Sequence, residues 1–225
     1  MAVSYAIRPA RETDIPQLVE IEKEAFPTTW PSTPFKRELS TRIASYLIAY
    51  ELPRYRQPRS SSAHEPSSGS SDAASRGLRG LWRRLFHQSK AHASFPADPE
   101  EYIAGYVATR YMTDEAHIME IAVRESLRGN GLGELLLMAS IELAMRRQSR
   151  VLTLEVRVSN QAAHSLYTKY GFSQVGLRKG YYSDNHEDAY IMTTDPISSP
   201  AYNQQFLNLE ETYKTRRGNV ALVLG

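Results

Sequence analysis

The chain turns from strand to helix at Arg128-Gly129-Asn130-Gly131-Leu132-Gly133. An apolar strand pattern ends shortly before this stretch, and a helical stripe of leucines begins within it. At such a junction the unpaired N–H groups and the positive end of the helix dipole point at a bound anion, and glycines let the backbone come close. Arg128 adds a charge suited to phosphate oxygens. The stretch by itself predicts an anion site.

Two other phosphate loops compete with this interpretation. A nucleotide-triphosphate P-loop is excluded because no Gly-Lys-Ser/Thr follows the glycines. A Rossmann dinucleotide site could take its downstream acid from Glu155. Its spacing, however, requires a third glycine where Glu134 stands, and a carboxylate there would face a pyrophosphate. The Rossmann interpretation therefore ranks second.

The surrounding periodicity predicts an α/β fold, with α+β character and a mixed sheet. Helices are expected after Thr13, over 131–147 and over 160–170. The predicted strands are 4–8, 46–50, 102–110, 116–123, 151–156, 172–177 and 188–193. We expect one domain over residues 1–195, followed by a polar C-terminal tail, 196–225, for which the sequence predicts no role.

Residues 53–98 interrupt that domain between two neighbouring strands. They are rich in Ser, Pro and Arg and carry eight Lys/Arg against three Asp/Glu, a composition that predicts a disordered insertion. One piece, 78–86, is basic and amphipathic. It could contact nucleic acid or a membrane surface, or be a short helix on its own domain or a linker element; Gly80 weakens a helix there.

The bulk composition narrows the function classes. The chain has 225 residues, a net charge of +2 and no cysteine, which excludes disulfides, Cys-ligated metals and a thiolate nucleophile. No apolar run is long enough to span a membrane, and no signal peptide is recognisable, so a cytoplasmic protein is expected. The histidines lack metal-ligand spacing, and we predict no metal.

Several motifs in order carry a family resemblance. Arg-x-x-Gly-x-Gly, directly after the strand 119–123, resembles the coenzyme A loop of the GNAT acetyltransferases. The resemblance continues through Leu154-Glu155-Val156-Arg157, Ser159-Asn160, 166–172, Tyr181-Tyr182 and 188–192. The combination is similar to the bacterial ribosomal-protein-alanine acetyltransferases over about residues 4–194, without the insertion. It implies a GNAT fold and an acyltransferase.

That resemblance implies acetyl-CoA as co-substrate and direct acetyl transfer, in a ternary complex, to the N-terminal amine of a ribosomal protein that begins with alanine. The backbone of the strand would pair with the pantetheine arm through a strand distortion, and Asn160, also a natural helix N-cap, would hydrogen-bond that arm. The implied cofactor-binding residues are Ile121, Ala122, Val123, Arg128, Gly129, Asn130, Gly131, Leu132, Gly133 and Asn160.

Two residues match the family's proton-transfer groups. Glu155 matches the general base, and we expect partial burial to raise its pKa; the alternative is a structural ion pair, for instance with Arg157. Tyr167 matches the general acid, and the alternative is a core tyrosine on a helical stripe. A phenol can protonate a departing thiolate.

The acceptor pocket is expected to use Trp30, Tyr181 and Tyr182. Two departures from the family pattern affect this region: 124–127 lacks the proline that commonly follows the strand, and the spacing over 26–30 is longer. Two other functions stay open. One is a GNAT enzyme for lysine or a small amine, and the other is a binding module that docks RNA or membrane through the basic insertion.

Overall fold

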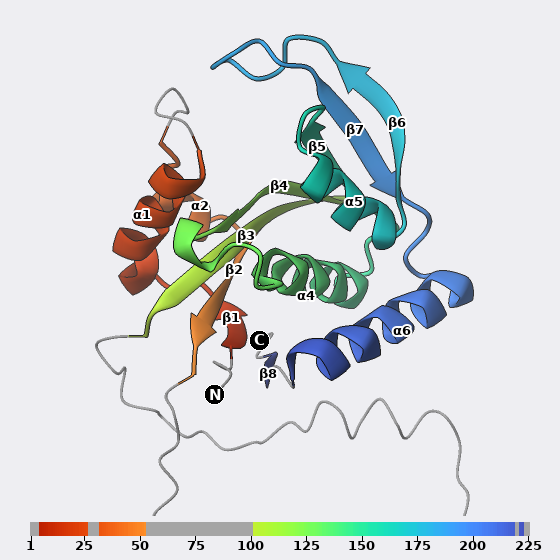
Figure 1. Cartoon of the computed structure of the whole chain (residues 1–225), viewed down its shortest axis with the longest axis horizontal. Helices are drawn as coiled ribbons and strands as arrows, with labels where there is room; N and C mark the ends of the chain where they lie inside the picture. The colour runs from red at the N-terminus through yellow and green to blue at the C-terminus, as the bar shows by residue number, and fades with distance from the viewer. Residues whose placement is uncertain (1–4, 27–31, 53–100, 219–220, 223–225) are drawn as a thin grey trace, which may run out of the picture. The chain divides into compact units, whose positions relative to one another are not determined.

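The computed structural model describes residues 5–26, 32–52, 101–218 and 221–222, which belong to one compact unit (Figure 1). The insertion expected at 53–98, with its basic piece 78–86, lies outside the described residues. The helices are α1 (Ile15–Ala25), α2 (Phe35–Leu39), α4 (Leu132–Arg146), α5 (Gln161–Lys169) and α6 (Pro200–Arg217), with 3-10 turns η1 (Glu12–Asp14) and η3 (Glu125–Leu127).

Eight strands form one mixed sheet, as the fold class expected. They are β1 (Tyr5–Pro9), β2 (Ala44–Glu51), β3 (Ile103–Met112), β4 (Glu115–Val123), β5 (Val151–Arg157), β6 (Phe172–Arg178), β7 (Ala189–Thr194) and β8 (Ala221–Leu222). Their order is β6-β7-β5-β4-β3-β2-β1-β8. The β4–β5 and β1–β8 pairs are parallel, and the others are antiparallel.

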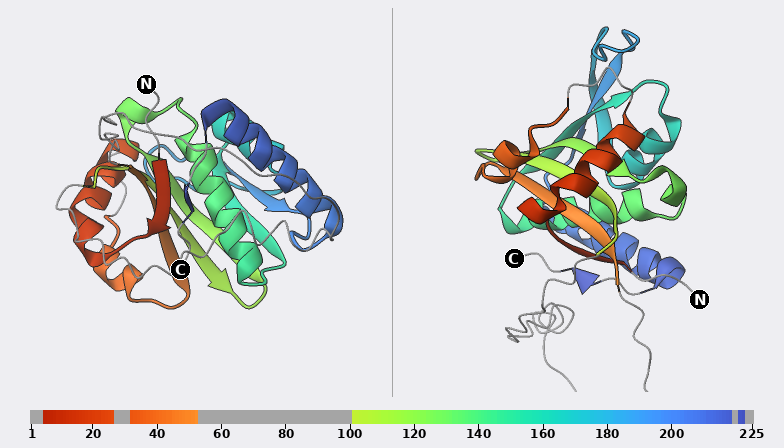
Figure 2. Two further views of the ribbon diagram at one scale, coloured as in Figure 1. Left: turned by 90° about the horizontal axis from the view of Figure 1, so that it is seen from below. Right: turned by 90° about the vertical axis from the view of Figure 1, so that its left-hand side faces the viewer.

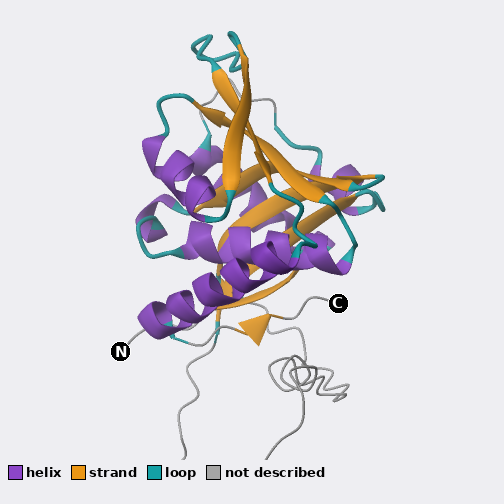
Figure 3. Ribbon diagram, turned by 90° about the vertical axis from the view of Figure 1, so that its right-hand side faces the viewer, coloured by secondary structure: helices purple, strands orange, loops and turns teal. Residues whose placement is uncertain are grey.

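Helices cover both faces of the sheet (Figures 2 and 3). On one face Leu135 and Leu136 of α4 belong to a core cluster with side chains of β5 and α6. On the other face Leu18 of α1 and Phe35 of α2 pack with Tyr106 of β3. This two-sided cover explains why β3 reads as a nearly continuous apolar run. Among the described residues, no helix has the length and apolar character that crossing a membrane requires.

Helix α6 is an element that the sequence analysis did not anticipate. Ser199 caps it by accepting a hydrogen bond from Tyr202 N at 3.2 Å, and Pro200 starts it. Tyr202, Phe206 and Tyr213 are buried in the same cluster as the α4 leucines. Two of these three anchors are tyrosines, so the segment reads as polar although it buries one face.

Candidate active site

The glycine loop between η3 and α4 presents a helix N-terminus without a side-chain cap. Gly129 and Gly131 have φ angles of 76° and 82°, in the left-handed region that glycine adopts without strain. Gly131 is the N-cap of α4, and no side chain accepts from the first turn. In the described chain no backbone hydrogen bond uses the N–H groups of 129–133. Leu132 is buried, and a Cβ at Gly133 would meet nothing within 4 Å. The loop therefore offers free donors to an anion.

The polar side chains within the loop are turned toward carbonyl oxygens. Arg128 Nη2 donates to Glu24 O at 2.9 Å, and its Nε donates to Val123 O at 3.3 Å. Asn130 Nδ2 donates to Leu127 O at 3.2 Å. These bonds fix the loop on α1 and on the end of β4, whereas the free N–H groups come from the backbone.

Glu134 lies in the first turn of α4, but its charge is neutralised on the side of α5 and α6. Its carboxylate pairs with Lys169, accepts from Tyr170 Oη at 2.9 Å, and meets Arg216 Nη2 at 3.3 Å. Burial alone would raise the pKa of Glu134, but the hydrogen bonds from Lys169 and Tyr170 lower it below its usual value. The Glu134 carboxylate thus links α4 to α5 and α6.

Strands β4 and β5 separate beside the loop. They pair only from Glu115 with Val151 to Ile118 with Leu154; beyond that point Glu155 pairs with Ile191 of β7. Residues 120–123 keep their partners on β3 alone. One backbone edge of β4, which includes Ile121, Ala122 and Val123, therefore faces the gap between the strands.

A β-bulge marks the point of separation. Ala108 pairs with Glu120 while Thr109 pairs with Ile118, so Met119 is an extra residue. Along a regular strand, residues 118 and 122 would point to the same face of the sheet. The bulge places them on opposite faces: Ile118 packs in the α4 cluster, whereas Ala122 packs in the α1–α2 cluster. The strand distortion implied by the resemblance is present in β4, just before Glu120.

Glu155 on β5 projects away from the α4 cluster, and its carboxylate holds two ion pairs. His117 Nε2 lies 3.1 Å from Oε2, and Arg178 Nε lies 3.0 Å from Oε1. The hydrogen bond from His117, followed by the charges of His117 and Arg178, lowers the pKa of Glu155 despite its burial. The expectation of a raised pKa is wrong, because burial is outweighed by the hydrogen bond from His117 and by the charge of Arg178. Arg157, the expected ion-pair partner, instead binds Asp184 and Glu187.

His117 is a site residue that the sequence analysis considered only as a metal ligand. It lies on β4 opposite Thr153, whose Oγ1 is 2.9 Å from its Nδ1. Thr153 Oγ1 donates in turn to Glu115 Oε1 at 2.7 Å. The parallel register of β4 and β5 brings His117 beside Thr153, and this register could have identified His117 as a site residue. The periodicity of a single strand does not reveal the register.

Tyr167 lies on α5, half-buried, with its ring centroid 5.7 Å from that of Phe172. Burial raises the pKa of Tyr167, and the neighbouring Tyr182 adds to the shift, so the phenol keeps its proton at neutral pH. Asn160 caps the same helix, accepting from Ala163 N at 3.1 Å, and its side chain fulfils the N-cap role foreseen.

Tyr181 and Tyr182 follow β6 and are close enough to Glu155 to interact with its charge. Their rings meet edge to face at 5.2 Å, and Arg157 stacks 3.8 Å over the ring of Tyr182. Burial raises the pKa of Tyr182 to about 12, and Glu155 contributes to that shift. Glu155, Tyr167 and both tyrosines thus gather at one end of β5. Trp30 lies outside the described residues.

Glu120 is a second acidic group that the sequence analysis missed. The bulge directs it toward the α1–α2 face, and burial with the charge of Glu22 raises its pKa to about 7. Tyr106, which is fully buried, interacts with it from β3. No group of three or more possible metal ligands is found among the described residues.

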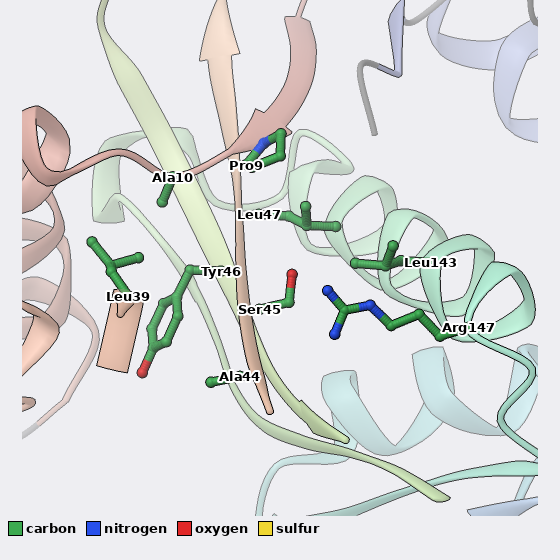
Figure 4. Close-up of a pocket in the computed structure, with 9 residues that line it drawn as sticks. All are labelled: Pro9, Ala10, Leu39, Ala44, Ser45, Tyr46, Leu47, Leu143 and Arg147. Carbon is green, nitrogen blue, oxygen red and sulfur yellow. The ribbon is translucent and has the colours of Figure 1, made fainter. Parts of the chain in front are cut away.

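The surface hollow in Figure 4 is a different place. It lies between β2, α2 and the C-terminal end of α4, lined by side chains such as Tyr46, Ser45 and Arg147. None of the residues predicted for the site lines it, so it carries no part of the argument.

Comparison with known proteins gives a consistent result. The model of the acetyltransferase (GNAT) family matches residues 61–172. A Bacillus subtilis (strain 168) protein, named provisionally as ribosomal protein bS18-alanine N-acetyltransferase, is 31% identical over 193 residues, 85% of this chain and 96% of that protein. The Escherichia coli (strain K12) ribosomal protein bS18-alanine N-acetyltransferase is 37% identical over 114 residues, 50% of this chain and 76% of its own.

A crystal structure of the Escherichia coli ribosomal-protein-S18-alanine N-acetyltransferase superposes with a TM-score of 0.59 at 25% identity, covering 87% of this chain and 95% of that one. These two matches cover 85% and 87% of this chain. The chain belongs to the GNAT acetyltransferase family and is an acyltransferase.

Proposed function

We propose that this chain transfers the acetyl group of acetyl-CoA to the N-terminal α-amine of a protein that begins with alanine. The observation that carries the proposal is the gap between β4 and β5. The free N–H groups of 129–133 lie at one end of this gap, and Glu155 lies at the other. The choice of acceptor is supported by the names of the Bacillus subtilis and Escherichia coli relatives, which are both alanine N-acetyltransferases.

The described residues fit acetyl-CoA. Its pyrophosphate needs hydrogen-bond donors without partners, and the loop supplies them at the N-terminus of α4. Its pantetheine arm carries amides that can pair with the open edge of β4 at Ile121 and Val123, while Asn160 lies at the start of α5. When bound, acetyl-CoA supplies a thioester.

Glu155 is proposed as the base. An α-ammonium has a pKa near ~8 and must lose a proton before its nitrogen can attack. The Glu155 carboxylate takes that proton, and a β4 N–H polarises the thioester carbonyl. As the new C–N bond forms and the C–S bond breaks, Tyr167 donates its phenolic proton to the leaving sulfur, and the second proton that the nitrogen loses on becoming an amide returns to the Tyr167 oxygen through solvent. The amine and thioester meet in one ternary complex.

The acceptor amine would enter beside Tyr181 and Tyr182, with Trp30 as a further contact. We include a ribosomal protein as the acceptor, and a cytoplasmic location, in the same proposal. Tyr181 is 42% exposed, so an acceptor peptide can contact its side chain. Binding of RNA or membrane by the basic insertion concerns residues outside the described part.

The test is acetyl transfer to peptides, followed by mass spectrometry. We expect the purified chain to acetylate an Ala-starting ribosomal-protein peptide, and to leave the same peptide unreacted once its N-terminus is blocked. Faster reaction of lysine side chains or small amines would establish the other acceptor class. No turnover with any amine between pH 6 and 9 would refute the proposed activity.

A further inference from the structure

Basic side chains of α6 reach the glycine loop from outside the family motifs. Arg217 Nη2 lies 3.5 Å from Gly129 O, and a Cβ at Gly131 would come within 3.1 Å of Arg217 Nε. Arg128, the cation within the loop, is engaged with Glu24 O and Val123 O. The guanidinium that lies directly over the two glycines is therefore Arg217.

The basic residues at the end of α6 differ in their partners. Lys214 pairs with Glu210 at 2.9 Å, and Arg216 pairs with Glu134 at 3.3 Å. Arg217 has no carboxylate partner among the residues that the structure describes, and its side chain is exposed. A guanidinium has five N–H donors, so the contact with Gly129 O leaves most of them free.

The position of Arg217 is fixed from both sides. Before it, Tyr213 is 3% exposed and its hydroxyl donates to Gly131 O at 3.3 Å. After it, Gly218 turns the chain at a φ of 88°, and β8 joins the sheet in parallel register, with Ala6 opposite Ala221. The arginine is thus carried by an anchored element, which limits the entropy lost when it binds a ligand.

We propose that Arg217 is a coenzyme A-binding residue, whose guanidinium contacts a phosphate group of the co-substrate at the glycine loop. The inference rests on the proposed function and adds a helix that the family motifs do not include. Free backbone N–H groups and an unpaired guanidinium converge on the same two glycines, and planar guanidinium donors match phosphate oxygens. Glu134 cannot compete for Arg217, because Lys169 and Arg216 hold it.

The test is calorimetric binding of coenzyme A to the full chain, without turnover. We expect Arg217→Ala to weaken binding about tenfold and Arg217→Lys to restore part of it, as one charge-assisted contact predicts. Lys214→Ala is the matched control, since it removes one charge from the same helix turn; we expect less than about a twofold change. The difference between Arg217→Ala and the wild type should shrink with added salt.

Dephospho-coenzyme A identifies the phosphate group. If Arg217 contacts the 3′-phosphate, Arg217→Ala loses affinity for coenzyme A only; if it contacts the pyrophosphate, both ligands lose affinity. Equal coenzyme A affinity in Arg217→Ala and the wild type, with unchanged helical circular dichroism, overturns the inference and leaves the proposed function standing. A wild type that binds no coenzyme A overturns both.

Discussion

Each carboxylate oxygen of Glu155 meets one nitrogen of a basic side chain, His117 on β4 and Arg178 on β6. The carboxylate therefore stays ionised well below neutral pH, which keeps it ready to accept a proton but weakens it as a base. Glu120 has the opposite balance, with burial and a neighbouring carboxylate and a pKa of about 7. The neighbours of Glu155 lower its pKa, whereas the neighbours of Glu120 raise its pKa.

Glu155→Gln should lower kcat by about 10²- to 10⁴-fold, the range typical for loss of a general base. The affinity for coenzyme A should stay unchanged, since Glu155 lies at the amine end of the proposed site. Steady-state kinetics with an Ala-starting peptide and calorimetry with coenzyme A separate the two effects. Glu142→Gln on α4 is the control, and equal activity in both variants would reject Glu155 as the base.

His117→Phe should move the acid limb of the kcat/KM profile to higher pH. Both basic side chains lower the pKa of Glu155, so removing either one raises that pKa, and activity is then lost at a higher pH as the pH falls. Arg178→Gln should produce a smaller shift, because its side chain is 54% exposed and more screened. Rate profiles from pH 5 to 9 test this, with Arg37→Gln as a control. A limb that does not move in His117→Phe contradicts it.

Glu120→Gln should stabilise the fold at alkaline pH. The folded-state pKa of Glu120 is raised from 4.5 to about 7, so its stabilising effect is complete below 4.5 and is lost as the pH rises toward 7. At 1.36 kcal/mol per unit, the ionised carboxylate costs on the order of 3 kcal/mol above that window. Urea unfolding at pH 5 and pH 8 should show a much larger variant gain at pH 8 than at pH 5. An equal gain at both pH values would contradict the buried-charge explanation.

Helices and strands with a strong apolar periodicity could be predicted from the sequence. Features that depend on how one element pairs or packs with another could not. The leucine stripe of α4 and the strands around it follow from apolar spacing, and Glu155 and Tyr167 follow from family motifs. The bulge at Met119 depends on how β4 pairs with β3, so neither Glu120 nor His117 could be placed from sequence. Helix α6 was missed because its buried anchors include two tyrosines.

Gly131→Ala should weaken coenzyme A binding much more than Gly133→Ala. Gly131 has a φ of 82°, and its added Cβ would lie 3.1 Å from Arg217 Nε and 3.4 Å from Tyr213 Cε2. The left-handed conformation costs an alanine about 1–2 kcal/mol, and the added Cβ also pushes against the Arg217 side chain. Gly133 has open space and ordinary helical geometry, so it is the matched control. Equal losses of affinity in the two variants would refute this role for Gly131.

Across the whole chain, the described residues on either side of the insertion lie side by side. Glu51 N donates to Tyr102 O at 3.0 Å, and β2 pairs with β3 as antiparallel neighbours. A short Gly-rich turn can therefore replace residues 53–98 without moving either strand. We expect this deletion to keep kcat and the melting temperature close to those of the wild type. A loss of all activity in a folded deletion variant would show that the insertion contributes to catalysis.

The parallel pairing of β8 with β1 also has a consequence for synthesis. Strands β1 and β8 are neighbours, so the outer edge of β1 has no β8 partner until residue 222 has left the ribosome. Until then a growing chain holds an open hydrogen-bonding edge. The glycine loop likewise acquires Arg217 only after residues 1–216 have been translated. A chain that ends before Arg217 would therefore keep an open edge on β1 and would lack the arginine proposed to bind coenzyme A.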